Sequence, residues 1–365
     1  MTRDWAEAAQ TRLGSMNWDW LALIGGVAIT AAALFDVFAT VVVPGRVGGL
    51  INAPRLLRTF MFRFWRGVQK LCTRNPHPRM DSVFGAMLLM LVLLVWVALT
   101  LFGLSLATWA LRLDFVPSLT RFGDAAFQIG SAMMTLGLSS QSATGWARAL
   151  VVIAGLCGFQ IITLTLSFIV QIQTALRDRD ALVLKLASRA GTPPSGIALL
   201  VTTRELDARG GLPQLFDRWE DWSAEVLYTH AAHPVLAYFR SDEGVIDWLT
   251  SMGAVLDAAS VTLAMLDDAP HGNARLMHHS GTRTVHQLCH AFGLGPRETP
   301  ELTDAEIARA AERLSAAGYS VLPARAAALR KLQHSYRREL GALLHHFGVD
   351  APAWVGKQEE CPASD

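Results

Sequence analysis

The chain has 365 residues, of which 52% are hydrophobic, and its formal net charge at neutral pH is +1. A charge so close to zero argues against nucleic acid as the main partner, and the length allows two or three domains. Three long apolar runs lie in the first half, whereas the second half has the composition of a soluble domain. The sequence therefore predicts an all-α membrane protein with three transmembrane helices, followed by an all-α cytoplasmic domain.

Residues 1–44 contain a polar flank and the first predicted span, which runs from about Leu21 to Val43. Trp18 and Trp20 precede it, where an aromatic belt at the membrane interface is expected. Asp36 is the only charged residue in this span. A charge inside a membrane is costly and often functional. Alternatively, Asp36 lies close enough to the end of the span to reach water or an arginine of the next segment.

Residues 45–81 form a predicted connector that is rich in basic residues and has one acidic residue, Asp81. By the positive-inside rule, this connector is cytoplasmic. Between Leu56 and Leu71, basic residues alternate with large apolar ones at helical spacing, which predicts an amphipathic helix on the inner leaflet. Membrane lipids are therefore predicted partners. The segment serves either in lipid recognition or gate coupling, or only as an anchor that orients the protein in the membrane. The basic residues are Arg46, Arg55, Arg58, Arg63, Arg66, Lys70, Arg74 and Arg79.

Residues 82–177 form a predicted pore module. Its first span runs from about Val83 to Leu113, and a short helix from Asp124 to Met134 follows, with Asp124 as the expected N-cap. This helix is well short of the about 20 residues that a bilayer crossing needs. After a loop, a long apolar helix runs from Ala149 to Leu176. A short helix, a Gly-bearing loop and a full span together predict a re-entrant pore helix and loop.

The loop after the short helix has a physical use. Non-helical backbone survives at membrane depth only where it is buried in protein or lines a water-filled cavity. Backbone carbonyls in such a loop can replace the hydration shell of a cation. Gly137 supplies backbone conformations that other residues reach only with strain. The partly negative C-terminal end of the short helix would favour cations nearby.

At these residues the chain resembles the tetrameric potassium-channel superfamily, whose filter reads Thr-Val-Gly-Tyr-Gly-Asp. Residues 135–137 match its first three positions, while Leu138 replaces the Tyr, Ser139 the second Gly and Ser140 the Asp. The resemblance covers residues 82–177. A looser echo of the residues that follow the filter comes from Thr144, Gly145 and Arg148.

The resemblance implies a homotetramer, because one loop cannot close a filter and four chains must surround one axis. The permeant ion would be K⁺ or Na⁺, with no cofactor. The departures fall on the outer half of the filter, which predicts weakened discrimination between the two ions. The implied filter residues are Thr135, Leu136, Gly137, Leu138 and Ser139.

Polar residues recur along the long apolar helix at steps of three and four residues. At 100° per residue they fall within an arc of roughly 80°. Such a stripe would line the cavity beneath the filter; alternatively, it hydrogen-bonds between packed helices. Gly155 and Gly158 are a possible hinge, or they permit close helix packing. The stripe consists of Gln160, Thr163, Ser167, Gln171 and Thr174.

Residues 178–365 are predicted to form an all-helical tail, preceded by a solvated helix exit at Arg177–Asp180. Leu215, Trp219, Trp222 and Val226 fit one face of a helix. A capping box opens a later helix, with Thr303 as the N-cap and Glu306 three residues on. Strands and helices do not alternate and no Gly-rich turn follows a strand, so a dinucleotide-binding domain is not predicted.

Histidines in the tail are weak metal candidates. His286 and His290 are one helical turn apart, a spacing that can chelate zinc or copper. No carboxylate completes a catalytic pattern, so the default interpretation is a histidine-rich helix without metal. No nucleophile elbow, Walker loop or kinase motif is present, and an enzyme is therefore not predicted.

The sequence thus predicts a pore-loop channel for monovalent cations in the cell (inner or plasma) membrane. Its N-terminus would lie outside and its C-terminal domain in the cytoplasm. The first alternative is a non-conducting membrane sensor or scaffold built on a pore-like fold. The second is a membrane-bound enzyme that uses the histidines of the tail.

Overall fold

The computed structural model describes residues 2–42, 78–139, 141–206, 211–239, 247–322 and 325–354, with the side chains of 2–17 and 78–84 left aside. The chain divides into two compact units. The first consists of Met1–Pro76 and Ala86–Ile172, and the second of His77–Gly85 and Gln173–Asp365. The predicted amphipathic helix from Leu56 to Leu71 lies outside the described residues, as does the connector around it up to residue 77.

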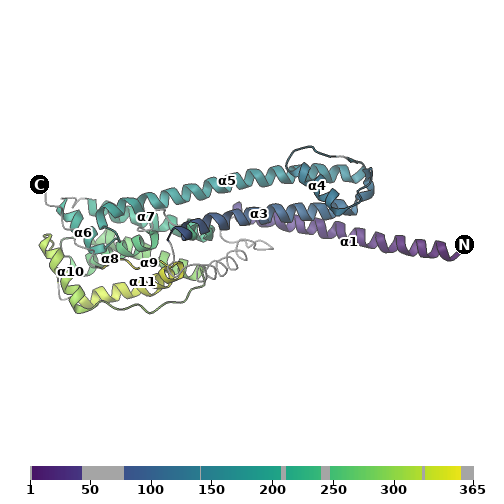
Figure 1. Ribbon diagram of the computed structural model, residues 1–365. Helices are drawn as coiled ribbons and strands as arrows, with labels where there is room; N and C mark the ends of the chain where they lie inside the picture. The colour runs from purple at the N-terminus through teal and green to yellow at the C-terminus, as the bar shows by residue number, and fades with distance from the viewer. Residues whose placement is uncertain are drawn as a thin grey trace. The chain divides into compact units, whose positions relative to one another are not determined.

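In the described part of the first unit, three long helices and one short helix form its framework (Figure 1). These are α1 (Thr2–Val41), α3 (Pro78–Ala110), α4 (Phe122–Met133) and α5 (Gly145–Ala190), of which α3 and α5 extend into the second unit. A short 3-10 turn, η1 (Arg112–Asp114), follows α3. Two short strands, β1 (Phe115–Val116) and β2 (Ser142–Ala143), pair antiparallel across the ends of the α4 segment. The sequence analysis missed this pairing, because two-residue strands have no detectable period.

Small residues bring α1 and α3 into close contact. A Cβ atom added to Gly26 would collide with the carbonyl oxygen of Gly103, and one added to Gly103 would collide with Oγ1 of Thr30. The Thr30 hydroxyl is already hydrogen-bonded to the Gly26 carbonyl at 2.9 Å. Such close approach of backbones at small residues is typical of helix packing in membranes, where dispersion contacts replace the hydrophobic effect.

Four helices in the described part of the chain are long and apolar enough to cross a membrane: Trp18–Val41, Gly85–Ala110, Gly145–Ala190 and Trp248–Met265. They indicate a multi-pass membrane protein. The first three overlap the segments that the sequence analysis identified as spans, although the first two end two and three residues earlier than predicted. The fourth is different, because 94% of its apolar window is buried inside the protein, against 22% for the window of Gly145–Ala190.

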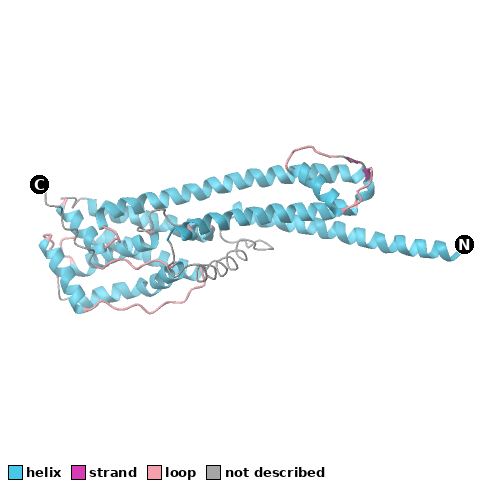
Figure 2. Cartoon of the chain, viewed as in Figure 1, coloured by secondary structure: helices cyan, strands magenta, loops and turns pink. Residues whose placement is uncertain are grey.

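The second unit is an all-helical bundle, shown in Figure 2. The fourth apolar helix, α8 (Trp248–Met265), lies in its core, and nearly all of its side chains are buried. On α7 (Gly211–Ala232) the predicted apolar face is confirmed, since Leu215, Trp219, Trp222 and Val226 are all buried. The remaining elements are α6 (Gly196–Glu205), η2 (Pro234–Tyr238), α9 (His271–Ala291), α10 (Asp304–Ala316) and α11 (Ala326–Phe347).

Local capping signals gave one correct and one wrong prediction. The box of Thr303 and Glu306 opens α10 as expected, with the Glu306 amide donating to Thr303 Oγ1 at 3.3 Å. Asp124 is not the N-cap of α4, because that helix begins at Phe122. Its carboxylate instead accepts from the Arg121 amide at 3.0 Å and from the Thr120 hydroxyl at 3.2 Å. Asp124 thus stabilises the start of α4 from the third position of the helix.

The predicted helix exit at Arg177–Asp180 is wrong. Helix α5 continues without a break to Ala190, and Arg179 is only 3% exposed. Its Nη2 donates to the Phe239 carbonyl at 2.9 Å, and its backbone carbonyl accepts from Trp222 Nε1 at 3.0 Å. These contacts come from α7 and from the residue after η2, so one residue of the run, Arg179, belongs to the core of the second unit, whereas Arg177 and Asp178 are exposed as expected.

Candidate functional site

The end of α4 leads directly into the predicted filter segment. After the helix, the Thr135 amide donates to the Ala132 carbonyl at 3.0 Å and the Leu136 amide to the Ser131 carbonyl at 2.9 Å. These two bonds satisfy carbonyls of the last helical turn, as C-terminal caps do. The chain therefore leaves the helix in a fixed direction, and residues 135–139 form an exposed loop at its C-terminal end.

The loop backbone alternates in handedness. Thr135 has φ +56° and Gly137 has φ +68°, whereas Leu136 between them stays outside the left-handed region. The sign of φ therefore changes at each step from Thr135 to Gly137. For a β-branched residue such as Thr135, positive φ costs about 1–3 kcal/mol, and such strain is found mainly at functional sites.

The side chains of the loop are exposed in the single chain. Leu136 is 62% exposed and Leu138 is 55% exposed. A Cβ atom added to Gly137 would meet nothing within 4 Å, so the requirement for glycine at this position comes from its φ angle and not from crowding.

Ser139 connects the far end of the loop to α4. Its Oγ lies within hydrogen-bonding distance of Oε1 of Gln128, a buried residue of α4, and accepts from the Gln141 amide at 3.1 Å. Ser139 therefore braces the loop against α4. The sequence analysis missed Gln128, whose place in a predicted apolar helix is a polar signal that could have been noticed.

Thr144, Gly145 and Arg148 hold the segment that leads from the loop into α5. The Thr144 amide and hydroxyl both contact the Asp114 carbonyl at 2.7 Å, and Arg148 Nε donates to the Ala143 carbonyl at 2.9 Å. Gly145 begins α5 with φ +49°. Together with the strand pairing, these bonds join the two ends of the segment that carries α4 and the loop.

The polar stripe of α5 is exposed along its whole length in the single chain. Thr163 bonds only to the Phe159 carbonyl one turn before it, at 2.9 Å. Large apolar side chains on adjoining positions, among them Leu156 and Phe159, are exposed as well. The stripe thus makes no side-chain hydrogen bond to another helix within the described part of this chain. The exposed members are Gln160, Thr163, Ser167, Gln171 and Thr174.

The two glycines of α5 face the C-terminal end of α4. A Cβ atom added to Gly158 would collide with the backbone of Met133, while one added to Gly155 would lie 3.6 Å from the Ala132 carbonyl. Gly158 therefore allows α5 to contact the very turn that leads into the loop. This geometry favours close packing, the second of the two interpretations of these glycines.

Asp36 does not reach water, which corrects one half of the local interpretation of this residue; the arginines of the next segment, from Arg46 to Arg74, lie outside the described residues. It is 1% exposed, and its Oδ2 accepts from Nε1 of Trp96 at 2.9 Å. Its Oδ1 has no partner among the described residues. The Trp96 ring is fully buried and lies 6.4 Å from the ring of Phe168 on α5. A buried acid in the first span is thus joined through one tryptophan to the helix that carries the polar stripe.

His286 and His290, the weak metal-site candidates of the tail, have different surroundings. Nε2 of His286 lies 2.6 Å from the Ser335 carbonyl and 3.6 Å from Glu339, whereas His290 is exposed on α9. Cys289 between them is buried and donates to the Leu294 carbonyl at 3.3 Å. Among the described residues, no group of three or more metal-ligating side chains comes together.

Comparisons with protein-family models, with curated proteins and with solved structures find no match to this chain.

Proposed function

We propose that the protein is a homotetrameric pore-loop channel that passes monovalent cations, K⁺ or Na⁺, through the loop of residues 135–139. Three helices, α1, α3 and α5, would cross the membrane, and α4 would enter it as a pore helix. The second unit would form the cytoplasmic domain. The basic connector, by the positive-inside rule, would face the cytoplasm and contact lipid headgroups there.

The observation that carries this proposal is the backbone alternation at Thr135 and Gly137. It lies where a short helix ends, beside the partly negative end of the helix dipole. Carbonyls of this loop turned to the axis of a tetramer would replace the water that a cation sheds. Positive φ just after a helix end is common, but glycine usually takes it, and at Thr135 the strain is costly unless it serves a purpose.

Uncovered surface in the first unit supports assembly with further copies. An apolar groove of about 340 Å³ lies between α3 and α4, with Val97, Phe127 and Leu136 among its lining residues. Trp146 at the start of α5 is 79% exposed. In a tetramer, neighbouring copies would cover such apolar surface while the polar stripe of α5 turned to the shared axis.

The test is cation flux into liposomes that contain the purified full-length chain. Gly137→Ala forces an L-residue to φ +68°, at a cost of about 1–2 kcal/mol, and is expected to abolish the flux or change its K⁺/Na⁺ ratio. Gly123→Ala is the matched control, because its Cβ also meets nothing within 4 Å and its φ is not positive. Absence of flux in the wild type, or identical flux in both variants, would remove the proposal.

One observation favours the alternative of a non-conducting sensor or scaffold. Leu138 and Ser139 stand where the filter sequence has Tyr and Gly, and the Ser139 side chain is fastened to Gln128. A loop braced in this way could remain closed. A tetramer that carries no flux under any ionic gradient, yet keeps its assembly, would support this alternative.

A further inference from the structure

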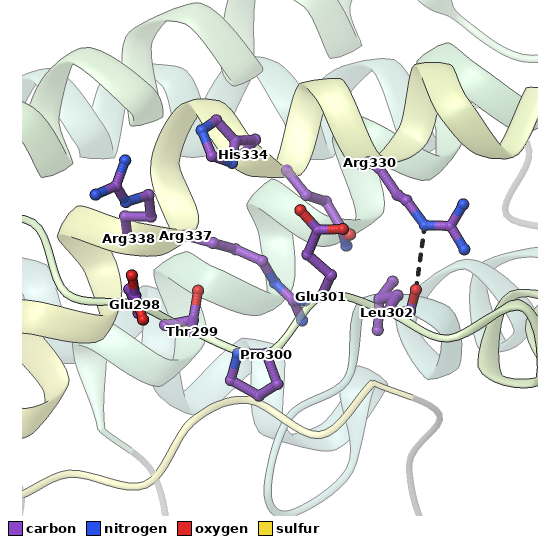
Figure 3. A pocket seen from close by; sticks show the side chains of 10 residues that line it. Glu298, Thr299, Pro300, Glu301, Leu302, Arg330, His334, Arg337 and Arg338 are labelled. Atoms are coloured by element: carbon purple, nitrogen blue, oxygen red, sulfur yellow. Dashed lines mark hydrogen bonds between the residues drawn. The ribbon is translucent and has the colours of Figure 1, made fainter.

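Two cavities in the described part of the second unit have the size of small-molecule sites. One of them, of about 350 Å³, lies between α11 and the loop that precedes α10 (Figure 3). Its arginines, Arg330, Arg337 and Arg338, point in different directions in Figure 3. Glu298 and Glu301 are exposed among its lining residues. This cavity therefore offers a ligand no concentrated charge of one sign.

The other cavity, of about 370 Å³, lies between the last turns of α5 and the first turns of α7. Three of its lining side chains are basic, namely Lys185, Arg189 and Arg218, and none of its lining residues is acidic. Its surroundings have the opposite balance, because residues 177–365 contain 24 acidic and 19 basic residues. The cavity therefore has the electrostatic character of an anion site.

The spacing of the basic residues directs them to one space. Lys185 and Arg189 are four residues apart on α5, so they lie on the same face of that helix. Gln214 and Arg218 have the same spacing on α7. Because both faces line the cavity, the two helices present three positive charges to it from two sides. Like charges four residues apart repel each other, and an anion between them would relieve that repulsion.

No described residue neutralises these charges by direct contact. Lys185, Arg189 and Arg218 are exposed, and none of the three makes a side-chain hydrogen bond or an ion pair with any residue that the structure describes. Arg189 lies in the last turn of α5, where the helix dipole also favours a cation. That explanation does not extend to Arg218, which lies in the interior of α7. The two arginines have planar forks of donors that match phosphate oxygens.

The acidic residues nearest in the sequence are engaged elsewhere or lie outside the cavity. Asp217 accepts from Nδ2 of Asn273 on α9 at 2.6 Å. Asp180 pairs with Arg179 at 2.8 Å. Asp221, one turn further along α7, is exposed but is not among the lining residues. The cavity thus keeps its positive charge although acidic residues flank it in the sequence.

The floor of this cavity is apolar and fixed in place. Leu186 and Trp219 belong to the core of the second unit, and the half-buried Leu182 packs against that core. One turn after Trp219, Nε1 of Trp222 donates to the Arg179 carbonyl at 3.0 Å and holds α7 against α5. The walls are therefore positioned before a ligand arrives, which lowers the entropy cost of binding.

We propose that this cavity binds a small soluble phosphate monoester. Its phosphate group is held by Lys185, Arg189 and Arg218, and its apolar end lies against Leu182 and the side-chain stems of the basic residues. A monoester carries nearly two negative charges at neutral pH, which three cations match better than the single charge of a carboxylate. The cavity is also far larger than a bare phosphate ion.

The position of the cavity along α5 favours a soluble ligand over a lipid. The apolar part of this helix ends near Leu176, and Lys185 follows nine residues later on the same unbroken helix, a rise of about 13 Å. The headgroup layer of one leaflet is only about 5–8 Å thick. This step rests on the proposed membrane span of α5, whereas phosphate binding itself does not depend on conduction.

Binding is tested by calorimetry on the full-length chain in detergent at neutral pH. The probes are phenyl phosphate, inorganic phosphate and benzoate, which separate the contribution of the apolar end from that of the charge. We expect phenyl phosphate to bind about tenfold more tightly than either of the others. Arg218→Gln should weaken phenyl phosphate binding about tenfold. Arg283→Gln is the matched control, because Arg283 is an exposed arginine of α9 outside the cavity, and should leave binding unchanged.

Further variants separate the two parts of the ligand. Leu182→Ala is expected to reduce the preference for phenyl phosphate over inorganic phosphate severalfold, because it removes apolar surface only. Lys185→Gln should weaken the binding of both phosphates. Gln214→Glu brings an acid into the cavity and should weaken phenyl phosphate more than benzoate. Thermal unfolding without a probe checks that each variant is folded.

Three results would overturn the proposal: no binding of phenyl phosphate below about 10 mM, equal affinities for phenyl phosphate and benzoate, or equal effects of Arg218→Gln and Arg283→Gln. Detergent micelles that contain phosphatidic acid are the last probe. Tighter binding to these micelles than to phenyl phosphate, with the same variant pattern, would overturn the choice of a soluble ligand and assign the phosphate to a lipid headgroup.

Discussion

Nη1 of Arg179 lies 3.4 Å from Nε2 of His230, and both side chains are buried in the second unit. The same Nη1 donates to the Leu236 carbonyl at 3.1 Å. A protonated imidazole beside a guanidinium would place two positive charges in contact, so the His230 ring is neutral and can accept. Burial lowers the pKa of His230 well below its usual 6.5, and the Arg179 charge lowers it further.

This depressed pKa predicts acid sensitivity of the second unit. Unfolded chains protonate histidine below about pH 6.5, but folded chains resist protonation of His230 until a lower pH. The free energy of unfolding therefore falls as the pH drops below about 6.5, and the stabilisation is fully present above it. Thermal unfolding from pH 5 to 8 measures the effect. His230→Gln, which keeps an acceptor for Arg179, should flatten the curve, whereas the exposed His290→Gln should not. Burial also lowers the pKa values of His233 and His278, so part of the slope should remain.

Arg179→Lys is expected to destabilise the second unit by about 2–4 kcal/mol, because lysine cannot reach the carbonyls of Leu236 and Phe239 together and leaves buried acceptors without donors. Arg177→Lys is the matched control, two residues away on the exposed face of α5. Denaturant unfolding of the purified protein measures both. If the two variants unfold at the same denaturant concentration, the Arg179 contacts do not hold α5 to the bundle.

Trp96→Phe removes the one donor that Asp36 has among the described residues, and should cost about 1–3 kcal/mol of stability. Replacing both partners removes the orphaned carboxylate, so Asp36→Leu with Trp96→Phe should recover part of that loss. The measurement is a double-mutant cycle on thermal unfolding in detergent. Strict additivity of the two single changes would contradict the bond between them.

Gly158→Ala is expected to destabilise the first unit by about 1–3 kcal/mol, because the new methyl group must displace the Met133 backbone. Gly25→Ala on α1 is the control, since its Cβ would make an ordinary contact 3.9 Å from Leu106. Unchanged stability with altered flux in Gly158→Ala would instead favour the hinge interpretation.

Local signals in the sequence were enough to predict the helices but not the contacts between them. Long apolar runs located the apolar parts of α1, α3 and α5, and apolar periodicity located the buried face of Trp219 and Trp222, because both patterns depend only on neighbouring residues. The capping box of Thr303 and Glu306 was found for the same reason. The loop at Thr135 and Gly137 was located as a break in the helix pattern, but the positive φ of a threonine is not a sequence signal.

Contacts between distant residues could not be found in this way. Asp36 and Trp96 are sixty positions apart, and Arg179 meets carbonyls more than fifty positions later in the chain. Aspartate and arginine are common near the ends of membrane spans and on solvated helices. Asp36 and Arg179 were therefore interpreted from their neighbours in the sequence alone. The cavity lined by Arg337 and Arg338 was missed too, because it exists only once α11 and the loop before α10 are packed together.

The position of Asp257 near the middle of α8 has a consequence for biosynthesis. The helix is apolar enough to be mistaken for a span when it leaves the ribosome, with a mean hydropathy of 1.3 against 2.1 or more for the other three. A central carboxylate adds about 2.5–3.5 kcal/mol to the free energy of insertion by the translocon. The acid that accepts hydrogen bonds from Gln333 and Tyr336 thus also disfavours insertion of this segment into a membrane.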